Sequence, residues 1–156
     1  MTYLNLRTQR EQARRARQDR VIDVRRDAWA TFLTRADSFL DHARELTTTL
    51  AESQSDERIE DVERYADEWT QFAASHAAPE LAGPAELAWA GKQFRRAVGA
   101  VGDACDSWHR DRRRPRGYDA QVETVQRTRE EFVATAQRLF DPQPPTGRRP
   151  RPGCPG

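Results

Sequence analysis

Acidic residues recur between positions 57 and 67 at a spacing that could hold a metal ion. They stand three or four positions apart, so on a helix they share one face. The residues are Glu57, Glu60, Glu63 and Asp67. Such carboxylates hold Mg²⁺ against phosphates in all-α nucleotide pyrophosphatases, but the site needs a second, facing pair. Only Glu123, Glu130 and Glu131 offer one, so a Mg²⁺-dependent hydrolase is the least favoured of the functions open to this chain.

Thiol and imidazole groups give no stronger indication of catalysis. Cys105 and His109 are four positions apart and would share a helix face, but a zinc site needs three or four ligands. Cys105 also falls on an apolar row, where a free cysteine packs as a small hydrophobic residue. His42, near Glu45, and the isolated His76 show no pattern of nucleophile and second partner that would indicate catalysis. We therefore predict a protein that is not an enzyme, with no metal and no cofactor.

Arginine is the residue type whose spacing is most informative. Near the N-terminus it recurs in steps of three and four, which on a helix makes one cationic stripe. The stripe consists of Arg7, Arg10, Arg14, Arg17 and Arg20. Acidic residues lie between its members and could neutralise it through i,i+4 pairs, or the stripe could dock on the acidic second helix of its own chain or of a neighbour.

A second arginine group falls in a turn-forming stretch beside Trp108 and His109. Its members are Arg112, Arg113, Arg114 and Arg116. Clustered arginines give salt-sensitive, sequence-independent affinity for nucleic acid. The net charge of +1 and the pI near 7.9 are not those of a strongly basic nucleic-acid-binding domain, so this function ranks second.

The elements that carry these groups are predicted to be helices. No proline or glycine interrupts residues 2–53, so one long helix is allowed. An apolar row with seven-residue periodicity starts at Val21 and Ile22, runs through Trp29, and continues to Leu50. Residues 1–20 have no such row. We predict a basic polar helical arm over 1–20 and a core-forming helix over about 21–53.

Three further helices are expected, over about 57–76, 84–113 and 119–140. The second has a predicted buried row of Ile59, Val62, Ala66, Trp69 and Ala73, supplemented by Tyr65 and Phe72. The third contains Gly91, Gly99 and Gly102, which permit close helix approach but leave open whether it is continuous. Residues 141–156 are rich in proline and predicted to be disordered.

The expected fold is therefore all-α: an antiparallel up-down-up-down four-helix bundle over residues 21–140, with a long N-terminal helix extending beyond the core. Residues 1–27 carry eight arginines against four acids, whereas residues 28–109 carry seven basic and fifteen acidic groups. The two cysteines show no disulfide or metal spacing, which suits a reducing cytoplasm. No apolar run is long enough for a transmembrane segment, although Tyr3, Leu4 and Leu6 could touch a membrane surface weakly.

Three segments resemble small Arg/Ala-rich helical proteins of actinobacteria. They are RRDAWATFL at 25–33, LAGPAEL at 81–87 and DACDSW at 103–108. The resemblance covers about residues 7–140 and implies a helical fold, but no activity and no functional residues. Some members have a membrane span before the position of Arg7, where this sequence has only Met1 to Leu6.

The function that these patterns favour is protein–protein interaction by a helical bundle, as an adaptor, an accessory factor or an oligomer. The arm has helix-forming residues but no face that a core would bury, which is typical of a partner-binding or self-associating segment. A solvated, frayed extension is the alternative interpretation of the same residues. The location expected from the sequence is the cytoplasm.

Overall fold

The computed structural model describes residues 2–52, 59–75 and 83–140, and within these ranges the side chains of all but 2–7 and 59. The described ranges contain four α-helices and no strand. They are α1 (Thr2–Glu52), α2 (Ile59–Ser75), α4 (Ala85–Asp111) and α5 (Tyr118–Phe140). The predicted all-α class is confirmed, and each helix end lies within a few residues of its expected position.

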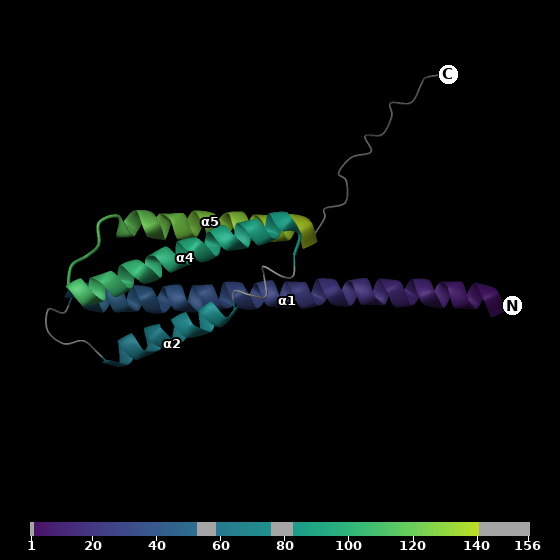
Figure 1. Ribbon diagram of the computed structural model, residues 1–156, viewed down its shortest axis with the longest axis horizontal. Helices are drawn as coiled ribbons and strands as arrows, with labels where there is room; N and C mark the ends of the chain where they lie inside the picture. Colours follow the sequence, from purple (N-terminus) through teal and green to yellow (C-terminus); the bar gives the residue numbers. More distant parts are fainter. Residues whose placement is uncertain (1, 53–58, 76–82, 141–156) are drawn as a thin grey trace, which may run out of the picture.

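Successive helices run in opposite directions, so the topology is up-down-up-down (Figure 1). The four helices form two hairpins, α1 with α2 and α4 with α5, and α4 joins the hairpins by packing on α1. The first half of α1 extends far beyond the ends of the other three helices (Figure 1). The bundle with a protruding N-terminal helix is thus as expected.

The core face of α1 begins at Trp29. From there the buried residues follow at steps of three and four: Trp29, Phe32, Ala36, Phe39, Ala43 and Leu46. This is the apolar row expected from the sequence, and it packs on all three other helices. Leu50 is only partly buried at its end.

The prediction that the core starts at Val21 was wrong. Val21 and Ile22 are 48% and 41% exposed, although both fit the periodicity of the row. The reason is the extent of the other helices: α2, α4 and α5 stop well short of the N-terminal end of α1, so none of the three covers the turns that precede Trp29 (Figure 1). The arm is therefore longer than residues 1–20.

The buried face of α2 is also rotated from the predicted one. Tyr65 and Phe72 are its buried residues, whereas Ala66 is exposed and Trp69 remains 37% exposed. Both aromatic rings of the buried face pack against α1: Phe72 stacks on Phe32, and the Tyr65 ring lies tilted against that of Phe39. Large aromatic side chains bury more apolar area than alanine, so they determine the orientation of the helix.

Helix α4 is continuous through its glycines. Gly91 packs against Trp29 and Phe132, and Gly102 packs against Phe39 and Trp69, so these two glycines do permit close helix approach. Gly99 has nothing within 4 Å of the position that a Cβ atom would take. The expectation that Gly99 permits close helix approach was therefore wrong.

Several predictions fall on residues outside the described part of the chain. They concern the side chains of Tyr3, Leu4 and Leu6, the residue His76, and the tail at 141–156.

Candidate functional site

The protruding part of α1, residues 8–24, has every side chain exposed. Arg10, Arg14 and Arg17 follow one another on one side of this arm, and Arg20 continues the series on the next turn. Arg7 belongs to the same helix, but its side chain is outside the described part. Among the described residues, Arg10, Arg14 and Arg17 have no ion-pair or hydrogen-bond partner. The arm thus presents its guanidinium groups to solvent.

Neutralisation of the stripe by neighbouring acids, which the sequence spacing allowed as an alternative, does not occur in the described part of the arm. Glu11, Asp19 and Asp23 form no ion pair with an arginine there. With 3.6 residues per turn, Asp19 and Asp23 lie across the helix from Arg10, Arg14 and Arg17. The arm is therefore two-sided, with a basic side and a mildly acidic one.

The base of the arm carries apolar side chains, those of Val21 and Ile22, that were predicted to lie in the core. Val24 is 67% exposed, more than Val21 or Ile22. The next turn is anchored to the bundle: Arg26 donates a hydrogen bond of 2.8 Å to the carbonyl oxygen of Phe140, and its guanidinium group lies 5.8 Å from the centre of that ring. The arm consequently leaves the bundle from a fixed point and exposes an apolar patch beside it.

The acidic row of α2 lies on the side of that helix opposite its buried aromatic residues. Glu60, Glu63 and Asp67 are all exposed, and Glu57 is outside the described residues. Glu60 forms a solvent-exposed ion pair of 3.9 Å with Arg64. Because this row faces away from the other helices, acids on α5 cannot complete a metal site with it within one copy. No group of three or more potential metal ligands occurs in the described ranges.

Cys105 is part of the core. Its side chain is fully buried between the helices, as expected from its place on the apolar row. Burial raises the pKa of the thiol from 9.0 to about 11, so the reactive thiolate is scarce at neutral pH. His109, one turn further along α4, is half-buried. Packing accounts for the cysteine.

The second arginine group surrounds the connection between α4 and α5. Arg112 ends α4 in the left-handed conformation, with φ of 54°, and Gly117 has φ of 83° just before α5. Arg112, Arg113 and Arg116 are exposed. This connection lies at the end of the bundle opposite the arm (Figure 1). The two groups of candidate arginines are therefore separate surfaces.

Arg114 has a structural role in that connection. Its guanidinium group lies 5.6 Å from the Trp108 ring centre and 5.8 Å from that of Tyr118, and it forms an ion pair with Asp119. The two rings meet edge to face, 5.6 Å apart. A guanidinium group so engaged holds the turn together and is poorly placed to contact a phosphate.

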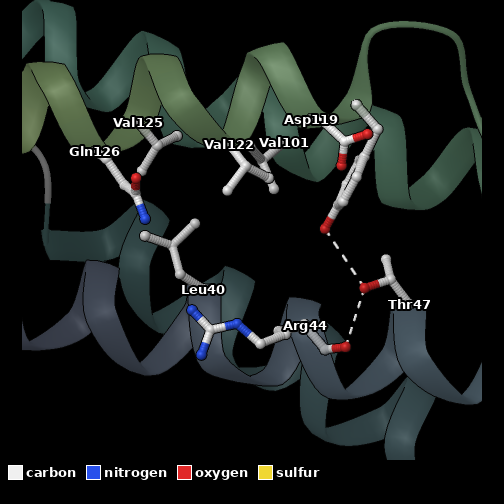
Figure 2. Close-up of a pocket in the computed structure, with 9 residues that line it drawn as sticks. Leu40, Arg44, Thr47, Val101, Asp119, Val122, Val125 and Gln126 are labelled. Carbon is white, nitrogen blue, oxygen red and sulfur yellow. Dashed lines mark hydrogen bonds between the residues drawn. The ribbon is translucent and has the colours of Figure 1, made fainter.

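A small cavity of about 220 Å³, which no sequence pattern predicts, opens between α1 and α5. Leu40, Val122 and Val125 point into it, with Arg44 and Gln126 at its rim (Figure 2). At one end the hydroxyl groups of Thr47 and Tyr118 are 3.4 Å apart. The lining could hold a small apolar group, but it contains no nucleophile paired with a base. The cavity is formed by side chains of α1, α4 and α5 together, which no residue pattern within one helix reveals.

None of the helices in the described ranges is both long enough and apolar enough to cross a membrane. Comparison of the chain with known protein families, curated proteins and solved structures finds no match.

Proposed function

We propose that the chain acts through protein–protein contact, as an adaptor or oligomerising bundle, and that the arm is its contact surface. One observation carries this proposal: residues 8–24 form a continuous helix on which every side chain is exposed. The same helix continues into the bundle, where its buried face begins at Trp29. The proposal assigns the chain no catalytic role.

Physical chemistry favours a partner for such a segment. Isolated helices are marginal in water, and most helices in proteins are stabilised by packing one face against another element. Within the described part of the chain the arm has no such contact, and its base exposes Val21, Ile22 and Val24. A partner that covers the arm would bury this apolar patch and stabilise the helix.

Nucleic-acid binding has weaker support from the same geometry. The basic arm and the 112–116 connection lie at opposite ends of the bundle, so they do not make one continuous basic surface (Figure 1). Arg114 is already held by Trp108, Tyr118 and Asp119. The row on the arm is short for a phosphate-binding surface, and the opposite side of the same helix carries Asp19 and Asp23.

The test uses the full chain and a charge-reversed arm, R10E/R14E/R17E. The protein is treated with nuclease and chemically cross-linked, and mass spectrometry then identifies the proteins joined to it. The wild type should form adducts through its arm, and the charge-reversed variant should not. The matched control, R96E/R110E/R127E, changes the net charge equally on exposed positions of α4 and α5 and should keep the adducts. Equal adducts from the arm variant, or a shift of duplex DNA or RNA at low salt that requires the arm, would reject the proposal.

A further inference from the structure

The side of α1 that faces α2 continues without interruption into the arm. Phe32 and Phe39 stack on rings of α2, and Arg35 donates a hydrogen bond to Gln71. Counting back from Phe32 in steps of three and four keeps to this side of the helix. The positions reached are Ala28, Val24, Val21, Arg17, Arg14 and Arg10. The arginine row therefore lies on the α2 side of α1, beyond the end of α2 (Figure 1).

The outer face of α2 has an ordered pattern of its own. Opposite Tyr65 and Phe72 it presents a row that begins with carboxylates and ends with neutral side chains. The row is Glu60, Glu63, Asp67, Thr70 and Ala74, and all five are exposed. Helix α2 as a whole carries five acidic residues against one arginine, and among the described residues the ion pair that reaches this face is that of Glu60 with Arg64.

The arm has the same order of charged and neutral positions with the opposite sign. Three arginines come first, and Val21 and Val24 follow them. The rows at 10–24 and 60–74 both span fourteen residue steps, or about 21 Å along a helix axis. Placed side by side and parallel, the two rows match basic with acidic groups at one end and valines with Thr70 and Ala74 at the other.

We propose that the arm of one copy packs on the outer face of α2 in a second copy, with the two helices parallel. Arg10 then lies near Glu60, Arg14 near Glu63 and Arg17 near Asp67. This inference rests on the proposed function and identifies its partner as the chain itself. The arm cannot reach α2 of its own chain, because α1 is one continuous helix that carries the arm away from α2 (Figure 1).

The contact is reciprocal. Within one copy α1 and α2 are antiparallel (Figure 1), so an arm that is parallel to the partner's α2 is antiparallel to the partner's α1. Two antiparallel α1 helices are related by a twofold axis, and each α2 then lies between its own α1 and the arm of the other copy. A twofold contact of this kind closes on itself, which is the commonest arrangement of soluble homo-oligomers. The assembly is a dimer with two equivalent arm–α2 contacts.

Sedimentation velocity of purified full chains tests this. The wild type should sediment as a dimer at low ionic strength and dissociate as salt rises, because the ion pairs are solvent-exposed. The variants R10E/R14E/R17E and E60R/E63R/D67R should each dimerise on the order of tenfold or more weakly, since like charges would face each other. An equimolar mixture of the two should recover the dimer, because reversed arm meets reversed α2 and native arm meets native α2.

The outcomes separate this inference from the broader function. A wild type that stays monomeric at low salt, or an α2-reversed variant that dimerises normally, overturns the reciprocal dimer and leaves arm-mediated contact with another protein intact. An arm-reversed variant that keeps both its dimer and its cross-linked adducts contradicts both. The helical circular dichroism signal shows whether each variant is folded. If a triple variant is unfolded, the single variants R14E and E63R are tested alone and as an equimolar mixture in its place.

Discussion

The ring of Trp29 packs against the ring of Phe132, with centroids 5.0 Å apart, and this contact closes the bundle where the arm begins. It joins the first helix to the last across most of the chain length. On one side of it the face of α1 is buried, and on the other side the face is exposed. The contact therefore divides α1 into a core helix and an arm.

Replacing Phe132 by alanine should destabilise the bundle strongly. Phe132 is fully buried and its ring contacts Trp29, Phe32 and Phe94. Removing such a ring from a packed core costs about 3–5 kcal/mol of unfolding free energy. Urea unfolding followed by circular dichroism measures the change. Phe140→Ala, at a partly buried position at the end of α5, is the control and should cost clearly less.

Removal of residues 1–20 should leave the stability of the folded bundle nearly unchanged. None of the described side chains at 8–20 is buried, and exposed residues away from special contacts change unfolding free energies by about 0.5 kcal/mol or less. The measurement belongs at low protein concentration and high salt, because a dimer adds apparent stability by mass action. A loss comparable to that of Phe132→Ala would show that the arm packs on its own bundle.

Two glycines of α4 should respond differently to alanine. A Cβ atom at Gly99 meets nothing within 4 Å, so Gly99→Ala should stabilise the protein by about 0.5–1 kcal/mol through helix propensity alone. At Gly102 the added atom would lie 3.3 Å from Trp69 and 3.4 Å from Phe39. Gly102→Ala should therefore gain less, or lose stability. Thermal unfolding of the two variants measures the difference in stability. A larger gain in stability for Gly102→Ala than for Gly99→Ala would contradict the close packing described for Gly102.

Stability should fall at alkaline pH because of Cys105 and Tyr65. Burial raises both pKa values above those of exposed groups, to about 11 for the thiol. The folded state then binds protons that the unfolded state has released, so stability is full below about pH 9 and is lost as pH rises through about 11. The thiol alone accounts for roughly 2 kcal/mol over this window. Urea unfolding between these pH values, in a reducing buffer, measures the loss, and Cys105→Ala should reduce the slope.

Tyr65 adds to the same effect through its partners. Its hydroxyl oxygen lies 3.0 Å from the carbonyl oxygen of Gly102 and 3.1 Å from Oδ1 of Asp106, and both are acceptors. Its proton serves only one of them at a time, and loss of that proton would leave three oxygens facing one another. A stability that is constant from neutral to alkaline pH would contradict the burial of both groups.

The helices and most of the core could be predicted from residue periodicity. The α1 row from Trp29 to Leu46 and the buried position of Cys105 follow from apolar spacing, because a helix with one apolar stripe must bury it. The start of the core could not be predicted, because Val21 and Ile22 fit the row equally well. Whether they are covered depends on where α2, α4 and α5 end in space, and one helix's own sequence does not contain this information.

For the candidate surfaces too, one part could be predicted from the sequence and another could not. Spacing alone placed Arg10, Arg14 and Arg17 on one side of a helix and the acids of α2 on one face. It could not show that this side of α1 is the one that faces α2, because that relation depends on packing around Phe32 and Phe39. Likewise, Arg114 belonged to an apparent basic patch until its position against Trp108 and Tyr118 showed a structural role.

Cross-linking between two copies tests the central claim most directly. In a Cys154→Ser background, a chain with Arg14→Cys is mixed with a tagged chain carrying Glu63→Cys, and a short bifunctional maleimide is added at low salt. The arm–α2 contact predicts rapid formation of the mixed dimer. Arg15→Cys is the control, because residue 15 is turned about 100° away around the helix, and it should react far more slowly. Equal rates for positions 14 and 15, or no mixed dimer from either, would contradict the contact.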